Sequence, residues 1–189
     1  MMGADYLGLP DDLPAPEDDG AADHLPGLRM PPLVLSTTAG TTIRLDDGAP
    51  ARTVLYFYPM TGRPGVALPA GWDAIPGARG CTPESCGFRD HFRELGEVGA
   101  SRVYGVSSQD LDYQREAVDR LHLPFPLISD RAHELADALS MPTFVAGGKR
   151  LYSRLTMVVR GGTIEHVFYP VFPPDTHAQQ VVDWLRTNP

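Results

Sequence analysis

Short blocks of hydrophobic positions recur from Leu33 onward, and they predict strands and helices in alternation. Two brief runs joined through Gly40 predict a hairpin over 33–36 and 41–45. A continuous run of β-branched and aromatic residues, TVLYFY at 53–58, predicts a strand that is buried on both faces. Further strands are expected at 102–108, 125–129, 151–159 and 163–168.

Helical spacing appears between these strands. The first helix is expected near Thr82, a suitable N-cap, followed by Pro83 and by the apolar residues Phe88, Phe92 and Leu95. Other helices are expected at 110–122, near 131–139, and at the end of the chain, where one face holds Ala178, Val181, Val182 and Leu185. This order predicts an α/β fold, a mixed central sheet with helices on both faces and an N-terminal hairpin.

Two stretches show neither the alternation of a strand nor the hydrophobic spacing of a helix, and they are expected to be loops. Residues 60–80 are rich in glycine and proline, with Trp72 as the one large anchor, and 141–150 are also open. A loop as long as 60–80 inside a compact domain usually has a function.

Charge sets the first 32 residues apart from the rest. They hold seven acidic side chains against one basic side chain, Arg29, and six prolines without helical or strand period. This composition predicts an acidic, proline-rich N-terminal arm over 1–32, disordered or lying along the surface, and one domain over 33–189.

Composition narrows the function classes. The chain has 42% hydrophobic residues and a formal charge of -8, with no basic region suited to nucleic acid. No apolar run approaches the roughly 18 residues that span a membrane, and the acidic N-terminus is unlike a signal peptide. A cytoplasmic location is therefore expected, without nucleic acid or membrane partners.

The only two cysteines of the chain stand five positions apart in GCTPESCGFRD, residues 80–90. If a helix begins at or just after Cys81, unpaired backbone N–H groups and the positive end of the helix dipole favour its thiolate. Cys81 is then the nucleophile. Cys86 lies further along the helix, where Phe88 and Phe92 indicate an apolar neighbourhood that keeps its thiol protonated.

Spacing restricts what the two thiols can do together. In an unbroken helix, residues five apart have Cα atoms about 8.6 Å from each other, whereas a disulfide needs less than about 7 Å. The pair is therefore either reduced with the helix intact, or oxidised with its first turns unwound.

Other roles for the two cysteines fit their spacing less well or only as well. A thioredoxin-type site would place two residues between its thiols. Positions 81, 86 and 91 each step by about 140° around a helix, so His91 cannot join them on one metal ion. On spacing alone, two buried cysteines acting as small apolar residues remain an alternative.

The segment GCTPESCGFRD closely resembles the active-site segment of peroxiredoxins, in particular the peroxiredoxin Q group, also called bacterioferritin comigratory protein. Four more segments resemble that family in the same order, over roughly residues 33–187: TVLYFYP, YGVSSQD, FPLISD and RLTMVV. The resemblance implies a thioredoxin-like fold and thiol peroxidase activity that needs no metal or organic cofactor.

The resemblance also assigns roles by position. It implies that Cys81 is the peroxidatic cysteine and Cys86 the resolving cysteine, which together form an intramolecular disulfide. Arg154 falls where the family keeps an arginine beside the thiolate, and Glu84 where many members have an acid that orients the arginine. The implied partners are a hydroperoxide and a thioredoxin-like reductant, for a monomer or homodimer.

The chain departs from the family pattern Pro-x-x-x-Thr/Ser-x-x-Cys, because Ala74 and Ala78 stand at the proline and hydroxyl positions. We expect Thr61, in the inserted loop, to fold back and supply the missing hydroxyl. A weaker pocket leaves a second hypothesis, a redox-responsive binding protein on the same scaffold with little peroxidase turnover. The segment FYPVFPP, at 168–174, is expected to be an exposed patch for dimer contact rather than core.

Overall fold

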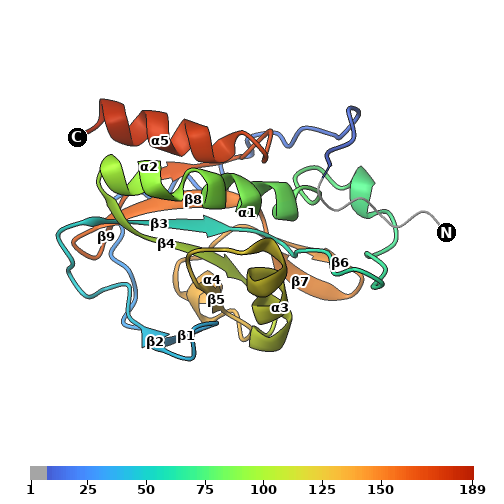
Figure 1. Cartoon of the computed structure of the whole chain (residues 1–189), viewed down its shortest axis with the longest axis horizontal. Coiled ribbons are helices and arrows are strands. Elements are labelled where there is room, and N and C mark those ends of the chain that lie inside the picture. Colours follow the sequence, from blue (N-terminus) through green and yellow to red (C-terminus); the bar gives the residue numbers. More distant parts are fainter. Residues whose placement is uncertain (1–7) are drawn as a thin grey trace.

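The computed structural model describes residues 8–189, and within this range a seven-stranded sheet has the order β2-β1-β5-β4-β3-β8-β9 (Figure 1). Its neighbouring strands β3, β4 and β5 run parallel, and the other pairs are antiparallel. The strands are β1 (Leu35–Thr37), β2 (Thr42–Ile43), β3 (Arg52–Phe57), β4 (Ala100–Ser107), β5 (Leu127–Ser129), β8 (Leu155–Arg160) and β9 (Thr163–Phe168). The predicted mixed sheet and N-terminal hairpin are confirmed.

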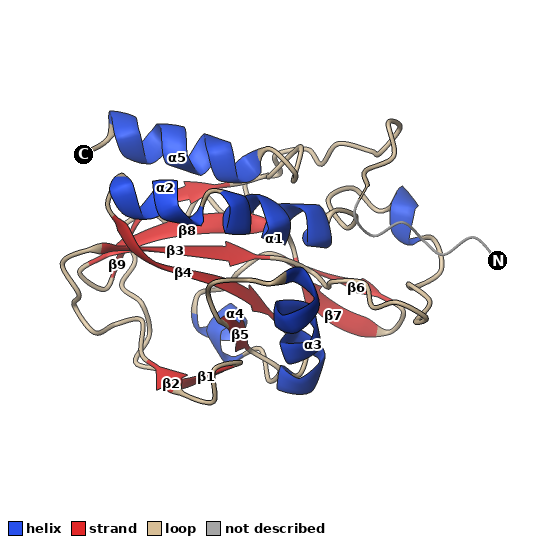
Figure 2. Ribbon diagram, in the orientation of Figure 1, coloured by secondary structure: helices blue, strands red, loops and turns tan. Residues whose placement is uncertain are grey.

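Helices cover both faces of this sheet, as predicted. The helices are α1 (Cys81–Asp90), α2 (Phe92–Glu97), α3 (Leu111–Leu121), α4 (Glu134–Ala138) and α5 (His177–Thr187), with a short 3-10 helix η1 (Trp72–Ala74) in the long loop. Figure 2 shows α1, α2 and α5 lying together along one side of the sheet. Within residues 8–189 no helix has the length and apolar character needed to cross a membrane.

Strand β3 organises the core because all of its residues are buried. Its alternate side chains enter two separate hydrophobic clusters. Val54 and Tyr56 join the cluster that includes residues of α1, α2 and α5, whereas Leu55 and Phe57 join the cluster that includes α4. The chain runs from the carboxyl end of β3 into the loop that precedes α1, so this buried strand anchors one end of that loop.

The first helix differs in detail from its prediction. It begins at Cys81 rather than after a Thr82 cap, because Gly80 occupies the N-cap position with a φ of 108° and no side chain caps it. The predicted continuous helix is divided at His91 into α1 and α2. The earlier start places the thiol of Cys81 in the first turn.

The open stretch expected at 141–150 is instead a β-hairpin, which is a correction. Strands β6 (Thr143–Ala146) and β7 (Lys149–Tyr152) pair antiparallel across Gly147 and Gly148, whose φ angles are 56° and 72°. A Gly-Gly pair between short runs is a known hairpin signal that the loop interpretation overlooked. The predicted strand 151–159 is also interrupted, because β7 ends before Arg154 and β8 begins after it.

Part of the acidic N-terminal segment enters the core. Leu25 is fully buried and Met30 is 3% exposed, in the same cluster as Leu55. Backbone hydrogen bonds join this segment to β9, from Gly27 N–H to the carbonyl of Ile164 at 2.8 Å among others. A disordered or purely superficial arm is therefore wrong for this part. The domain boundary at residue 33 stays a prediction, and residues 1–7 of the arm lie outside the described residues.

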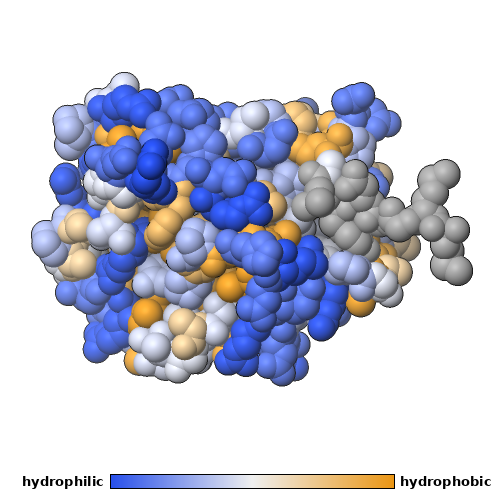
Figure 3. All heavy atoms as spheres, in the orientation of Figure 1, coloured by the Kyte–Doolittle hydropathy of each residue, from blue (hydrophilic) through white to orange (hydrophobic). Residues whose placement is uncertain are grey.

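The segment 168–174 is mostly covered rather than exposed. Val171 is 2% exposed and Pro174 is buried, and the Tyr169 hydroxyl donates to Asp19 of the N-terminal segment at 2.9 Å. Phe172 remains 39% exposed. The expected exposed patch is therefore reduced to Phe172 and its neighbour Pro173, which is also exposed, while 168–170 are half-buried. On the face in Figure 3 the hydrophobic surface is broken into small areas.

Candidate active site

Cys81 occupies the first position of α1 and is 3% exposed. Arg154 Nη2 donates to the Cys81 Sγ at 3.2 Å, and the thiol lies 3.6 Å from the carbonyl oxygen of Ala78. The structure therefore brings together the cysteine and the arginine that the sequence singled out, across 73 positions of the chain.

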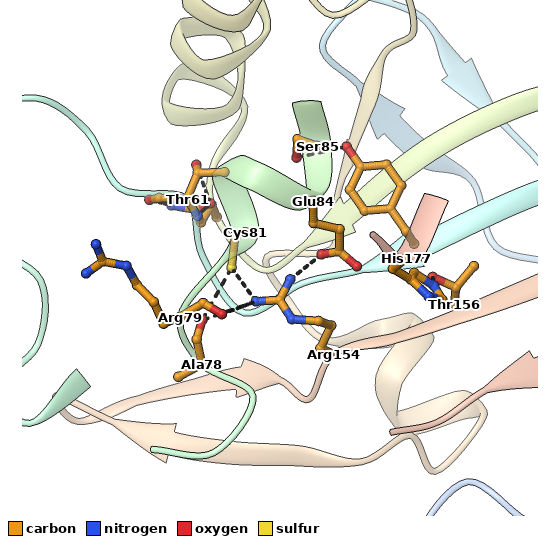
Figure 4. A network of polar contacts seen from close by, with 11 residues as sticks. Thr61, Ala78, Arg79, Cys81, Glu84, Ser85, Arg154, Thr156 and His177 are labelled. Atoms are coloured by element: carbon orange, nitrogen blue, oxygen red, sulfur yellow. Dashed lines mark hydrogen bonds and ion pairs between the residues drawn. The ribbon is translucent and has the colours of Figure 1, made fainter. Parts of the chain in front are cut away.

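The Arg154 guanidinium lies at the centre of the site in Figure 4. Its Nη1 donates to Glu84 Oε2, and its Nη2 also donates to the carbonyl oxygens of Ala78 and Arg79, at 3.2 and 3.1 Å. Arg154 reaches these partners because it stands in the break between β7 and β8, beneath the start of α1. A buried, multiply bonded guanidinium holds a fixed direction toward the thiol.

Glu84 lies one helical turn after Cys81 and is completely buried. Burial raises the pKa of this carboxyl to about 7, although attraction to Arg154 opposes the rise. The charge of Glu84 therefore changes near neutral pH, right beside the guanidinium that faces the thiol.

The expected low pKa of Cys81 is wrong for this closed arrangement. Burial raises the pKa of the Cys81 thiol above its ordinary value, Arg154 opposes the rise, and Glu84 adds to it. The helix terminus and the arginine are visible in the sequence, but the loss of water around the sulfur is not. Formation of the thiolate consequently depends on Arg154, on the charge of Glu84 and on access of solvent.

Replacing Glu84 with glutamine will lower the pKa of Cys81, because the substitution removes the negative neighbour that disfavours the thiolate. The pH dependence of Cys81 alkylation by iodoacetamide, measured with Cys86 changed to serine, reports this pKa. The gain in rate should be largest above pH 7, where Glu84 of the parent is ionised. Glu97→Gln, at an exposed position of α2, is the matched control. An unchanged profile would contradict the role of Glu84.

Cys86 lies further along the same helix and is half-buried against the cluster that contains Phe88. Burial raises the pKa of its thiol, with Arg89 opposing the rise, in agreement with the predicted protonated state. Both cysteines are free, and α1 is continuous from Cys81 to Asp90. The two thiols are thus held apart in this reduced form.

Thr61 is buried, but it does not join the thiol contacts. Its hydroxyl and its backbone N–H both donate to Gln109 Oε1, at 3.2 and 3.0 Å. Gln109 Nε2 donates in return to the Thr61 carbonyl at 3.3 Å. At position 78 the chain offers Cys81 a backbone carbonyl in place of a hydroxyl. A direct role for Thr61 at the sulfur stays a prediction.

Three segments cover Cys81. The 60–80 loop forms a small cavity at the thiol, about 10 Å³ in volume and lined by Met60, Leu68 and Trp72 among others. Leu9 and Pro174 pack against Gly80, directly before the cysteine. The volume is about that of one water molecule, so this arrangement holds the thiol almost dry.

Replacing Gly80 with alanine will destabilise this cover. An added Cβ would overlap with Pro174 and lie 3.0 Å from Leu9 Cδ2, at a φ of 108°. Gly99→Ala is the matched control, because its φ is 100° and nothing lies within 4 Å of an added Cβ. We expect a loss of about 1 kcal/mol in unfolding free energy for Gly99→Ala, and about 2 kcal/mol more for Gly80→Ala. Equal losses in urea unfolding would show that the packing contributes nothing.

Sequence reasoning missed His177, the first residue of α5. It is fully buried, with Nδ1 3.0 Å from Gln180 Oε1 and Nε2 2.8 Å from the Thr156 hydroxyl. Burial lowers its pKa to about 4, and the charge of Arg154 contributes to the shift. His177 is therefore neutral and ties α5 to β8 two residues from Arg154. Its place at the start of an amphipathic helix was the only signal in the sequence.

No group of three or more histidine, cysteine, aspartate or glutamate side chains that could hold a metal ion occurs within residues 8–189. The polar groups around Cys81 are instead two donors from one guanidinium, a carboxyl and backbone carbonyls. Of these groups the guanidinium favours an anionic sulfur and an oxygen that gains negative charge next to it, whereas the carboxyl disfavours the thiolate when it is ionised.

Comparison with known proteins gives three kinds of match. The Redoxin family model matches residues 25–182. Chloroplastic peroxiredoxin Q of Gentiana triflora is 26% identical over 96% of this chain and 78% of its own, and that of Sedum lineare is 26% identical over 85% and 77%. The crystal structure of peroxidoxin BcpB from Mycobacterium tuberculosis is 26% identical, with a TM-score of 0.67 over 86% of this chain and 97% of that one. A Xanthomonas campestris peroxiredoxin Q structure, also 26% identical, has a TM-score of 0.63 over 85% and 97%.

Proposed function

The chain belongs to the Redoxin family, as a member of the peroxiredoxin Q or bacterioferritin comigratory protein group, and from this premise we propose that it is a thiol peroxidase with Cys81 as its peroxidatic residue. The observation that carries the assignment is the 3.2 Å contact from Arg154 Nη2 to Cys81 Sγ at the start of α1. A buried thiol that acts only as a small apolar residue has no need of a guanidinium beside it.

The first step is attack of the Cys81 thiolate on one peroxide oxygen. An S–O bond forms as the O–O bond breaks, Cys81 becomes a sulfenic acid, and the departing alkoxide or hydroxide takes a proton and leaves as alcohol or water. Negative charge moves from sulfur to the departing oxygen during this step. Arg154 stabilises that movement because its Nη2 already donates to the reacting sulfur.

Cys86 completes the cycle. Its thiolate attacks the Cys81 sulfur, a disulfide forms, and the hydroxyl of the sulfenic acid leaves as water. In intact α1 the Cα atoms of the two residues are about 8.6 Å apart, so the first turns must unwind. A thioredoxin-like dithiol protein then reduces the disulfide and becomes oxidised itself.

The proposal also covers the location, oligomeric state and partners of the enzyme. We assign it a cytoplasmic location, a monomeric or homodimeric state, and no nucleic acid or membrane partner. The chloroplastic location of the plant relatives belongs to those proteins. The charge balance of the chain supports the absence of nucleic acid binding, since acidic side chains outnumber basic ones by 24 to 16.

A redox-responsive binding protein is the second candidate. It is favoured by Ala78, which offers no hydroxyl, and by Thr61, whose hydroxyl is engaged with Gln109. In that case disulfide formation would unwind α1 and expose a surface to a partner. Steady-state assays with thioredoxin would then give almost no turnover, while each chain still lost two daltons with peroxide.

The test of the peroxidase is Cys86→Ser. This variant should consume one equivalent of hydrogen peroxide and then stop at the Cys81 sulfenic acid, because no second thiol remains to condense with it. Dimedone labelling and intact mass measure the trapped species, while the parent turns over continuously with thioredoxin and thioredoxin reductase. A Cys86→Ser variant that consumes no peroxide would rule out the assignment of Cys81.

A further inference from the structure

Residues 9–17 lie across the part of the chain that leads into α1, and we call them the strap (Figure 1). Leu9 Cδ2 is 3.0 Å from the point that a Cβ on Gly80 would occupy. Pro16 approaches Gly77 in the same way, with its Cβ and Cγ at 3.6 and 3.7 Å from the corresponding point. The strap therefore packs on two glycines that stand just before α1.

Beneath the strap, segments that are far apart in the sequence close on one another. A space of only about 10 Å³ is left between Leu13 and Pro14 of the strap, the loop 60–80, the segment after β9 and Arg154. Val171, in the segment after β9, is 2% exposed. Since this volume is about that of one water molecule, the strap seals the site on the side of the arginine.

The strap is held by apolar contacts alone. Within residues 8–189, no hydrogen bond or ion pair joins residues 9–17 to another part of the chain. The half-buried residues of the strap are Leu9, Leu13, Pro14 and Pro16, whereas its acids Asp11, Asp12 and Glu17 are exposed. A segment with partly covered side chains and no hydrogen bonds to its surroundings opens at a low free-energy cost.

The chain directly after the strap is fixed more firmly. Asp18 accepts the backbone N–H of Gly20 at 3.0 Å, and Asp19 accepts the hydroxyl of Tyr169 at 2.9 Å. Leu25 is fully buried in the core. The strap can therefore leave its place while the chain from Asp18 onward stays where it is.

The surface under the strap depends on an intact α1. Gly80 is the N-cap of this helix, with a φ of 108°, and its carbonyl oxygen accepts the N–H of Glu84 at 3.0 Å. A disulfide between Cys81 and Cys86 requires the first turns to unwind, because residues five apart in a helix are too distant for an S–S bond. Unwinding breaks this hydrogen bond and moves Gly80 away from Leu9. The contacts of the strap are therefore tied to the thiol form of the pair.

We propose that the strap is a redox-controlled cover, which is seated while Cys81 and Cys86 are thiols and leaves when they form their disulfide. The inference rests on the proposed function and adds a regulation of the same site. Because the strap binds only the form with an intact α1, it stabilises that form and opposes unwinding by the same factor. It therefore slows the capture of oxidised Cys81 by Cys86, and it favours reduction of the disulfide.

Limited proteolysis tests the release of the strap without peroxide. Diamide joins the two thiols by taking one hydrogen atom from each, and is itself reduced to the hydrazine. The endoproteinase Asp-N should then cut before Asp11 and Asp12 about tenfold faster in the disulfide form than in the dithiol form, because cleavage follows the population of the open segment. Cleavage before Asp23, whose N–H is bonded to the carbonyl of Gly20, is the internal control and should be equally slow in both forms. Equal cleavage before Asp11 in both forms would overturn the proposal.

Replacing both Leu9 and Leu13 with serine will unseat the strap in either form. Disulfide formation after a pulse of hydrogen peroxide should then be about tenfold faster, as expected for the loss of two half-buried leucine side chains. The phase to compare is the one that does not depend on peroxide concentration, followed by acid quench, alkylation of the remaining thiols and mass spectrometry. Leu28→Ser, at a position beyond the strap that is 39% exposed, is the matched control and should form the disulfide at the parent rate. The parent rate in the double variant would overturn the role of the strap in opposing unwinding.

The failure of this proposal differs from the failure of the proposed function. If the peroxidase assignment is wrong, hydrogen peroxide is not consumed, yet diamide still forms the disulfide and releases the strap. If only the strap proposal is wrong, hydrogen peroxide is consumed with thioredoxin, and oxidation leaves the cleavage before Asp11 unchanged. If diamide cannot join Cys81 to Cys86, the strap proposal is wrong together with the disulfide cycle.

Discussion

Cys81→Ser will consume no hydroperoxide in the presence of thioredoxin and its reductase. Serine keeps the position and nearly the volume of the side chain, but its hydroxyl is not ionised at any pH at which the protein is folded, and so it cannot attack the peroxide bond. Arg154 would still face residue 81, so the loss reports the sulfur itself rather than a disrupted site. Peroxide remaining in solution, followed over at least 100 turnovers of the parent, measures the effect.

Two controls accompany this variant. Circular dichroism and urea unfolding should show that Cys81→Ser folds, and Cys86→Ser should still complete its single turnover. These controls separate the two thiols, which share one helix but differ in burial and in neighbours. Peroxide consumption by Cys81→Ser at the parent rate would exclude Cys81 as the reacting residue.

Arg154→Met will lower the second-order rate with hydrogen peroxide by about one hundredfold. A hydrogen bond from a charged donor contributes about 1.5 to 3 kcal/mol, which corresponds to one to two decades in rate. The same substitution removes the cation that opposes the effect of burial on Cys81, so the pKa of the thiol will rise further. The alkylation profile of Cys81 should therefore move to higher pH, and stopped-flow measurement of the first oxidation step gives the rate.

Arg154→Lys distinguishes charge from geometry. Lysine keeps the positive charge but cannot bond to Glu84, to two carbonyls and to the sulfur in one plane, so an intermediate rate is expected. Arg160→Met is the surface control, at the far end of the strand β8 that follows Arg154, since Arg160 is half exposed and pairs with Glu165 at 3.8 Å. A rate for Arg154→Met within twofold of the parent would remove Arg154 from the mechanism.

The sequence indicated most of the fold because the strong patterns decide it. The uninterrupted apolar run at β3 became a fully buried central strand, and the helical period near the end of the chain became α5. The hairpin β6–β7 was missed because each of its strands is only 4 residues long, too short to establish a period in the sequence. Burial of Leu25 was missed because an isolated leucine among prolines has no period.

The candidate site also has features that the sequence predicted and features that it did not. Spacing and family resemblance brought out Cys81, Cys86, Arg154 and Glu84, and in the structure Arg154 contacts both Cys81 and Glu84. Desolvation could not be predicted, because it depends on segments as distant in the sequence as Leu9 and Pro174. Burial of the sulfur raises the Cys81 pKa, which is opposite to the expected direction. His177 gave no signal beyond its place at the start of an amphipathic helix, since its contact with Thr156 joins that helix to a strand 21 positions earlier in the chain.

The central claim is that Cys81 is oxidised first and is then captured by Cys86 of the same chain after α1 unwinds. The most direct measurement is peptide mass spectrometry after one equivalent of hydrogen peroxide, at low protein concentration and without reductant. The account predicts a monomeric chain lighter by two daltons, with one disulfide linking Cys81 to Cys86. Peroxide consumed while both thiols remain free to alkylation would contradict it.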